Sequence, residues 1–348
     1  MKKYLPYLLV IILLLAVAGW FIYNQSPGTI NAREGQFSVK HGKGVSKIIL
    51  SETDAGTVEL SNATGVWMVN GKYAAREDLI DNLLKVIIRV QSLSPVPVSA
   101  QNNVVREMLA HHVRVQIFDV KHNLLKSYWV GGPSTDAQNT YMLLETDGKP
   151  ATRPHLTYIP GIKGYLTGRY NTDEETWRTK VLFNYKEEDI KALSVAYLQE
   201  EQNSFNLTRV APDSFALSPA SGQYKIEDSY QQKYIRQYLA FYSSIYLETF
   251  DNGLARKDSL LKSTPFCTIS ITENDNSVNT VKLYHMPVSK RTRVQFDFKG
   301  NDMPYDLEHY HASVHNGKDL AIVQYYTFGK ILRNYKEFFF KPAAVGAR

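Results

Sequence analysis

The stretch Gly65-Val66-Trp67-Met68-Val69-Asn70-Gly71 predicts a β-strand that ends in a tight turn. β-Branched and aromatic residues suit the pleated backbone of a strand, and Asn-Gly is a preferred dipeptide in two-residue hairpin turns. Two further strand-like segments, over residues 45–50 and 57–60, precede this one. This part of the chain is therefore expected to form neighbouring β-strands.

Directly after this turn the apolar pattern changes to the spacing of a helix. From Arg76 to about Val90, apolar side chains recur three and four residues apart, which places them on one helical face. They are Leu79, Ile80, Leu83, Leu84, Ile87 and Ile88. Strand-like segments return over residues 113–118, 125–130 and 141–144. Strands grouped before and after one helix favour antiparallel sheet with helices packed on one face.

The second half of the chain presents the same order of segments. Strand-like segments up to residue 217 precede tyrosines at helical spacing between Tyr230 and Tyr246, and strand patterns follow over residues 268–272 and 281–284. This order aligns Trp67 with Phe215. It predicts two similar lobes, with a coincidental order of elements as the alternative.

The composition is that of a folded protein. The chain has 348 residues, with 40 Lys and Arg against 34 Asp and Glu, and 44% of its residues are hydrophobic. This balance excludes a disordered or collagen-like chain. The single cysteine, Cys267, excludes an intramolecular disulfide and any zinc site built on several cysteines.

An uncharged run extends from Tyr4 to Tyr23 after two lysines. A helix rises about 1.5 Å per residue, so the run would span about 30 Å, the thickness of one hydrocarbon core. Tyr4, Trp20 and Tyr23 lie near its ends, where aromatic rings favour the membrane interface. These features predict a membrane anchor that crosses once. A cleaved signal peptide ending near residues 16–18 is the alternative.

The predicted fold is therefore α+β, with an N-terminal transmembrane helix followed by two similar lobes of antiparallel sheet with helices packed on one face. The lysines before the anchor would stay in the cytoplasm, which predicts a bacterial inner-membrane protein whose bulk is periplasmic. The expected divisions are an anchor over 1–23, a linker over 24–32, a first lobe over 33–180, a second lobe over 181–342 and a disordered tail over 343–348.

The richest cluster of titratable residues lies near His309 and His311. If residues 308–312 form a strand, the two histidines share one face and Asp306 could complete a metal site. However, no HExxH motif is present, and a solvated structural position is the favoured interpretation. We therefore expect no metal, no cofactor and no catalytic residue, with His309, His311 and Asp306 as the weak metal candidates.

The sharpest basic run comprises Lys290, Arg291 and Arg293. Such a run suits anionic lipid headgroups, a polyanion or an acidic partner, and a solvated hairpin is the alternative. Nucleic acid is not expected as a partner, because the predicted compartment lies outside the cytoplasm.

Several of these segments together resemble a known family. The strand and turn over residues 65–71, the helix over 79–90, the segment Trp177-Arg178-Thr179-Lys180-Val181-Leu182-Phe183 and the N-terminal apolar run look like the bacterial family catalogued as domain of unknown function 4340. The resemblance covers most of residues 30–250. It implies a membrane-anchored envelope protein, and many members are encoded beside gliding-type ABC transporter subunits. It implies no catalytic residues.

The sequence therefore predicts a non-enzymatic envelope protein that binds a periplasmic partner or serves as an accessory subunit of an ABC-type transporter or another envelope complex. Two alternatives remain. One is a metal-assisted periplasmic hydrolase that uses His309, His311 and Asp306. The other is a periplasmic ligand-binding module with an apolar pocket between the two lobes.

Overall fold

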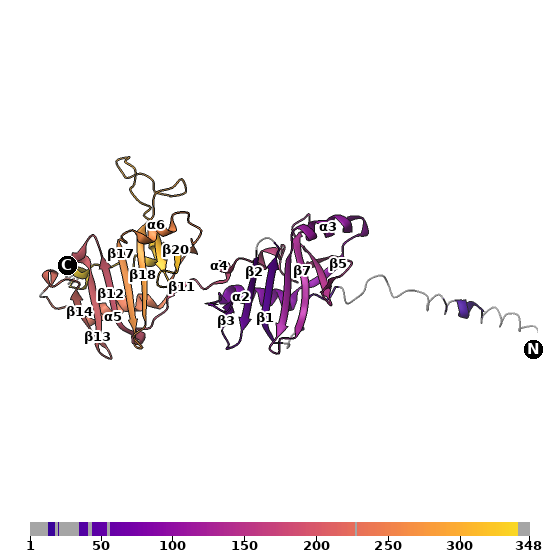
Figure 1. Ribbon diagram of the computed structural model, residues 1–348, viewed down its shortest axis with the longest axis horizontal. Helices are drawn as coiled ribbons and strands as arrows, with labels where there is room; N and C mark the ends of the chain where they lie inside the picture. The colour runs from indigo at the N-terminus through magenta and orange to yellow at the C-terminus, as the bar shows by residue number, and fades with distance from the viewer. Residues whose placement is uncertain are drawn as a thin grey trace, which may run out of the picture. The chain divides into compact units, whose positions relative to one another are not determined.

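A computed structural model describes residues 13–17, 20, 35–40, 44–53, 56–226 and 228–339. The chain divides into two compact units, with unit 1 ending at Thr179 and unit 2 beginning at Lys180 (Figure 1). The residues on either side of this boundary belong to separate cores. Trp177 is buried in unit 1, where its Nε1 donates to the Asn171 carbonyl at 2.8 Å. Leu182 and Phe183 are buried in the core of unit 2.

Unit 1 is built on an antiparallel sheet whose described strands run in the order β4-β3-β2-β1-β6-β7-β8-β10-β5, with β9 paired to β8. Its central strands bury alternate side chains, as a sheet with one face on a core requires. The strands are β1 (Val45–Glu52), β2 (Gly56–Asn62), β3 (Trp67–Val69), β4 (Tyr73–Ala74), β5 (Gln91–Pro95), β6 (Val113–Asp119), β7 (Leu124–Pro133), β8 (Thr140–Thr146), β9 (Lys149–Pro150) and β10 (His155–Tyr158).

Helices cover both faces of this sheet. Helix α2 (Glu77–Arg89) lies where the apolar spacing predicts a helix, and it buries Ile80, Leu83, Val86 and Ile87 against one face. Helix α3 (Val98–Ala110) packs Val104 and Met108 against a separate cluster. Short turns, η1 (Thr167–Arg169) and α4 (Glu174–Trp177), lead to the boundary.

Unit 2 is built on a second antiparallel sheet, with its described strands in the order β14-β13-β12-β17-β18-β19-β20-β16. These strands are β12 (Ile190–Tyr197), β13 (Phe205–Ala211), β14 (Ser214–Pro219), β16 (Thr249–Phe250), β17 (Cys267–Glu273), β18 (Val278–His285), β19 (His309–Val314) and β20 (Asp319–Gln324). A separate pair joins β11 (Val181–Phe183) to β15 (Ile245–Tyr246).

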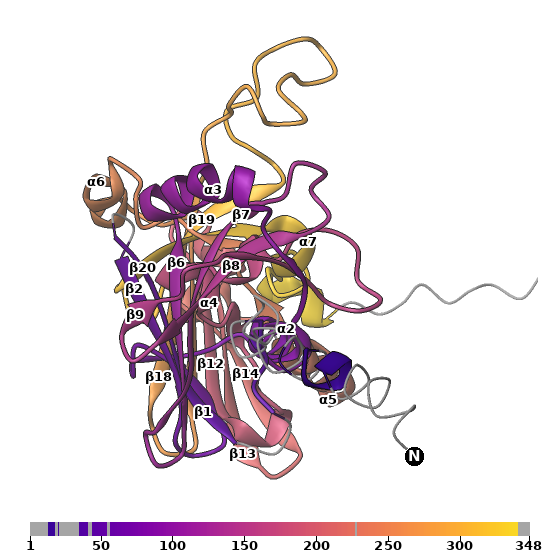
Figure 2. The ribbon, with the colours of Figure 1, turned by 90° about the vertical axis from the view of Figure 1, so that its right-hand side faces the viewer.

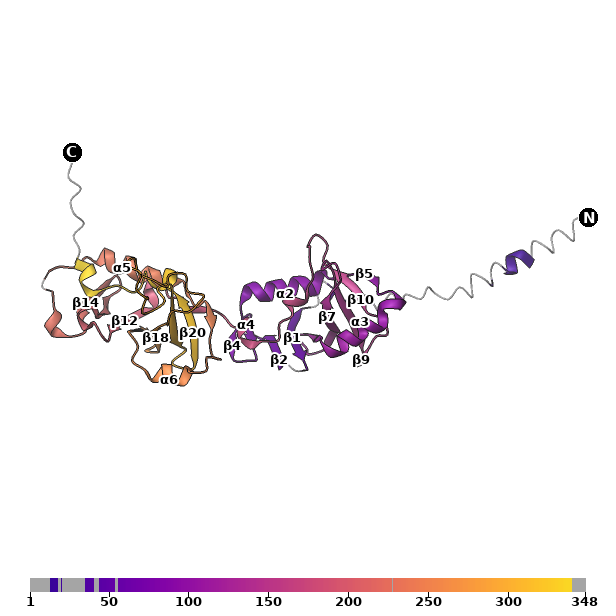
Figure 3. The ribbon, with the colours of Figure 1, turned by 90° about the horizontal axis from the view of Figure 1, so that it is seen from above.

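The helices of unit 2 are short. Helix α5 (Gln232–Ala240) packs Ile235, Tyr238 and Leu239 into the core, and α6 (Lys257–Lys262) lies on the other side of the strands (Figure 3). The remaining elements are α7 (Tyr325–Phe328), η2 (Glu187–Asp189), η3 (Glu201–Asn203), η4 (Gly222–Tyr224), η5 (Phe241–Ser243) and η6 (Tyr335–Phe339).

The two sheets share one topology. Apart from the short strands β4, β9, β11 and β15, three strands in each unit lead to a helix, an edge strand and a second helix, and four further strands complete the sheet. The register makes individual residues equivalent. Val113 pairs with Val130, and Val130 with Met142, while at the same place in unit 2 Cys267 pairs with Leu283, and Leu283 with Ala312.

The prediction of an α+β fold with helices on one face is wrong. The described residues form mostly antiparallel sheet with few helices, so the fold is mostly β. Tyrosine spacing up to Tyr246 predicts a longer helix, but α5 ends at Ala240 and the chain re-enters a strand as β15. In unit 1, Met142 faces the core with α2 and its neighbour Leu143 contacts α3, because alternate strand residues point to opposite faces.

The predicted single-pass anchor and inner-membrane location are also overturned. No helix in the described residues is long and apolar enough to cross a membrane. The longest of those helices, α2 and α3, have 13 residues each, whereas a hydrocarbon core needs about 20. Of the predicted anchor, the structure describes residues 13–17 and Trp20 as helical. Tyr4, Tyr23, the predicted linker over 24–32 and the predicted tail over 343–348 lie outside the described residues.

Candidate functional site

The units differ most in the connection between two equivalent strands. In unit 1, residues 134–139 join β7 to β8 as a short turn. In unit 2, Met286–Glu308 join β18 to β19 and rise away from the sheet as the long orange loop in Figures 1 and 2. We call Met286–Glu308 the projecting loop.

The tip of the projecting loop is an ordered turn. The Asp297 carboxylate accepts hydrogen bonds from the backbone N–H groups of Lys299 and Asn301, at 2.8 and 2.9 Å. Across the same turn, the N–H of Asp297 donates to the Asn301 carbonyl at 2.8 Å. This turn presents Phe298, whose side chain is 95% exposed.

The root of the projecting loop is fixed by the buried carboxylate of Asp306. It accepts hydrogen bonds from the N–H groups of Glu308 and His309, at 2.7 and 3.1 Å, and from the Thr292 hydroxyl at 3.1 Å. Burial alone would raise the pKa of Asp306, but these hydrogen bonds together outweigh it and lower the pKa below its ordinary value. The loop is therefore held at its base by a charged group.

The predicted basic run lies on this loop. Lys290, Arg291 and Arg293 are all exposed. Arg293 forms a 3.5 Å ion pair with Glu308, whereas the side chains of Lys290 and Arg291 have no acidic partner among the described residues. The loop as a whole balances four basic against four acidic residues, and Lys290 and Arg291 are exposed cations without an ion pair in the described part of the chain, next to Thr292 at its root.

Exposed aromatic side chains gather on the projecting loop and at its foot. Phe296 is 57% exposed, Tyr305 45%, and Tyr326 on the neighbouring helix α7 is 92% exposed. In residues 35–179 of unit 1, as described, the exposed large aromatic is Tyr165, at 48%. Large exposed apolar groups that cluster in one place mark interaction surfaces.

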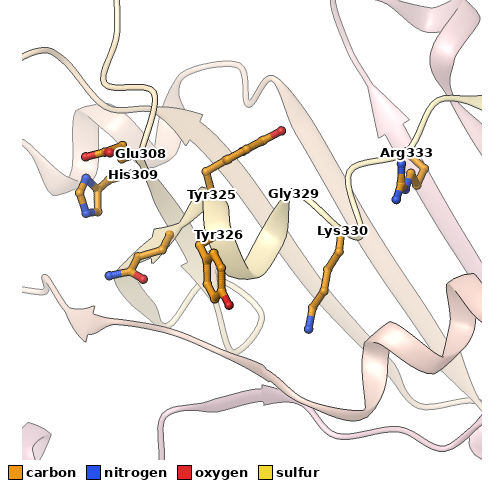
Figure 4. A pocket seen from close by; sticks show the side chains of 8 residues that line it. Glu308, His309, Tyr325, Tyr326, Gly329, Lys330 and Arg333 are labelled. Carbon is orange, nitrogen blue, oxygen red and sulfur yellow. The ribbon is translucent and has the colours of Figure 1, made fainter. Parts of the chain in front are cut away.

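An open cleft of about 640 Å³ lies at the foot of the loop (Figure 4). Figure 4 shows Tyr326 and Lys330 pointing the same way from α7 and the residues after it. His309 lies at the other side, with its Nδ1 3.2 Å from Asp306 and its Nε2 3.5 Å from the carboxylate of Glu248. The cleft is lined by Glu308, His309, Gln324, Tyr325, Tyr326, Gly329, Lys330 and Arg333.

His311 lines a different pocket, so the structure does not bring the two histidines into one site. This pocket, of about 330 Å³, lies between α6 and the strands β18 and β19. Burial lowers the pKa of His311, while the Asp251 carboxylate, 3.6 Å from its Nδ1, acts in the opposite direction. No three His, Cys, Asp or Glu side chains within the described ranges lie close enough together to hold a metal ion.

Sequence reasoning missed the residues that line this second pocket. Arg256, Ser259 and Ser263 come from α6 and its flanks, and they meet His285 and His311 only because the sheet brings the strands beneath that helix. A usable signal for the loop tip was present, since Phe296-Asp297-Phe298-Lys299-Gly300 sets two aromatic residues around a turn-forming aspartate.

Comparison with family models, with curated proteins and with solved structures finds no match for this chain. The resemblance to the domain of unknown function 4340 family therefore stays a prediction. The function has to be argued from the geometry of the two units.

Proposed function

We propose that the protein acts by binding a protein partner through the projecting loop of unit 2, and not by catalysis. The observation that carries this proposal is the position of Phe298, 95% exposed at the tip of a loop fixed at its root. An aromatic side chain that enters a pocket of a partner contributes more to affinity than most other contacts.

The order of the loop favours binding. Association loses less conformational freedom when the contacting segment is already held in one conformation. The Asp297 turn and the Asp306 contacts supply that order within the isolated chain. Phe298 can thus be buried in a partner at a smaller entropic cost than a residue of an unstructured segment.

Two exposed cations of the loop indicate one part of the chemistry of the partner. Lys290 and Arg291 have no acidic partner among the residues described in unit 2. Complementary charge across an interface speeds association and selects the right partner. The proposed partner therefore presents an apolar pocket for Phe298 and acidic side chains opposite Lys290 and Arg291. A subunit of an ABC-type transporter is the partner class that the family resemblance implies.

The test places a photo-crosslinking amino acid at position 298 in the full chain, within the native cells. The control carries the same amino acid at Gln138, which is exposed in the equivalent connection of unit 1. We expect one protein to be captured from position 298 and not from position 138. That protein, once purified, should bind the wild-type chain and bind Phe298→Ala at least about tenfold more weakly.

Two results would defeat the proposal. The first is equal capture from both positions. The second is that the chain binds vesicles containing anionic lipid and that Phe298→Ala removes this binding, because the loop would then recognise a lipid surface and not a protein.

A further inference from the structure

We call the face of each sheet that lies opposite α2 or α5 its outer face. A helix covers this face more closely in unit 1 than in unit 2. In unit 1, α3 lies close against β7 and β8 and packs Val104 and Met108 on Leu143. The approach is so close that a Cβ atom at Gly131 would lie 2.8 Å from the Met108 side chain. Glycine at this position therefore allows the helix to seal the sheet.

The same position in unit 2 carries a large residue. Gly131 follows Val130 and Tyr284 follows Leu283, so the register makes Gly131 and Tyr284 equivalent. Tyr284 is buried, and its hydroxyl lies 3.5 Å from the Leu261 carbonyl in α6. The phenol ring acts as a spacer between sheet and helix, and α6 buries none of its own residues. The pocket of about 330 Å³ is the space that remains.

The pocket contains polar groups whose hydrogen-bonding capacity is unused. His311 is 3% exposed, and its Nδ1 has no hydrogen-bond partner. A buried polar atom without a partner costs stability, and a proton shared with the Asp251 carboxylate would relieve that cost. Because Nδ1 is itself buried, a molecule in the pocket can meet the ring only at Nε2. Arg256 has no acidic partner among the residues that the structure describes, and Ser259 also lines the pocket. The Ser263 hydroxyl donates to the Leu260 carbonyl at 2.6 Å and can offer a ligand only an acceptor.

The position of Asp251 determines which nitrogen of the His311 ring can contact a ligand. Its carboxylate lies on the Nδ1 side, 3.6 Å away. Burial favours the neutral ring, whereas an anion bound in the pocket would act together with Asp251 to favour the protonated ring, which donates from Nδ1 to Asp251 and from Nε2 to the ligand. The positive charge that is present before a negatively charged group binds is therefore that of Arg256.

The wall of the pocket next to these groups is aromatic. The ring of His285 stacks on Phe266 at 4.3 Å and on Tyr305 at 4.1 Å between centroids. Pro287 and Pro304 complete the side formed by the projecting loop. Such a wall suits a flat, apolar ring better than a hydrated inorganic ion.

We propose that the pocket under α6 binds a small organic anion, a carboxylate or a phosphate monoester carried on an aromatic ring, with Arg256 and His311 contacting the charged group. This proposal goes beyond partner binding by the loop, and it does not require Phe298.

The test measures binding of benzoate, phenyl phosphate and uncharged benzyl alcohol to the full chain by calorimetry. The variants are Arg256→Gln and His311→Gln, and the matched control is Lys262→Gln, which removes a charge from the same helix outside the pocket. We expect at least one anion to bind, benzyl alcohol to bind far more weakly, and Arg256→Gln to weaken the anion about tenfold or more. Lys262→Gln and Phe298→Ala should bind like the wild type.

Stronger binding of phenyl phosphate than of benzoate would assign a phosphate monoester, and the reverse order a carboxylate. The proposal is overturned if neither anion binds, if benzyl alcohol binds as tightly as the anions, or if Arg256→Gln and Lys262→Gln weaken binding equally. A circular dichroism spectrum of each variant shows whether a loss of binding comes from loss of fold.

Discussion

Unit 1 and unit 2 share one strand order. They differ in how a helix covers the outer face of the sheet and in the length of the connection between two equivalent strands. Unit 1 seals its outer face with α3, and a short turn of residues 134–139 joins β7 to β8. Unit 2 leaves a pocket under α6 and sends the projecting loop out from the equivalent place. The shared strands thus form the common core of both units. The candidate binding features, the pocket under α6 and the projecting loop, lie where unit 2 departs from unit 1.

The largest expected effect is on the free energy of unfolding, and it tests whether the two sheets have equivalent but separate cores. Leu60 and Leu207 are fully buried at the same register position of β2 and β13. We expect Leu60→Ala and Leu207→Ala each to lower the free energy of unfolding of its own unit by about 2–5 kcal/mol. Calorimetry should show one transition lowered in each variant. If both variants lowered the same transition, the units would not have separate cores.

The next effect concerns the root of the projecting loop. Asp306→Ala removes the acceptor of the Thr292 hydroxyl and of the N–H groups of Glu308 and His309, and it also removes the contact with His309 Nδ1. We expect a loss of about 2–3 kcal/mol in the local stability of the loop. Trypsin should then cleave the loop faster, next to Lys290, Arg291 or Arg293. The control is Asp136→Ala in the short turn of unit 1, which should leave cleavage of the projecting loop as in the wild type. Equal cleavage of the projecting loop in both variants would contradict the account.

A smaller effect is expected from disturbing the close packing of α3 on the outer face of unit 1. Gly131→Ala would bring a Cβ atom to 2.8 Å from the Met108 side chain and lower the free energy of unfolding of unit 1 by about 1–2 kcal/mol. Gly168→Ala is a fair control, because nothing lies within 4 Å of its added Cβ. Chemical denaturation measures both variants, and equal stability would show that α3 does not lie close to β7.

The smallest effect is the pH dependence of the loop root. The pKa of Asp306 is lowered in the folded chain, so its carboxylate stabilises the loop above pH about 4. That stabilisation is lost as the pH falls through the lowered pKa. The amide signals of Glu308 and His309 in NMR spectra should therefore show a titration step below pH about 4. Asp306→Asn should abolish this titration, and a midpoint above the ordinary aspartate value would refute the assignment.

Local patterns of the sequence were sufficient for some elements. Trp67, Met68 and Val69 form β3, and Asn70 and Gly71 adopt the positive φ angles, 51° and 64°, that an Asn-Gly turn requires. The spacing of apolar residues also located α2. Both signals depend on neighbours within a few residues, which is why the sequence alone reveals them.

Features that depend on distant parts of the chain were not predictable in this way. The sequence placed His309 and His311 together, but His309 contacts Asp306 and Glu248 while His311 contacts Asp251 beneath α6. Gly131 lets α3 lie close to the outer face and Tyr284 holds α6 away from it, and no local pattern shows that these two residues are equivalent. The exposure of Phe298 likewise follows from the long-range contacts at the root of the loop.

The most direct test compares one exposed aromatic residue from each unit. The partner captured from position 298 is titrated against the full-length wild-type chain, Phe298→Glu and Tyr165→Glu. If binding lies in the features special to unit 2, Phe298→Glu lowers the affinity about tenfold or more and Tyr165→Glu leaves it unchanged. Equal affinities for all three chains, or a loss confined to Tyr165→Glu, would contradict the account.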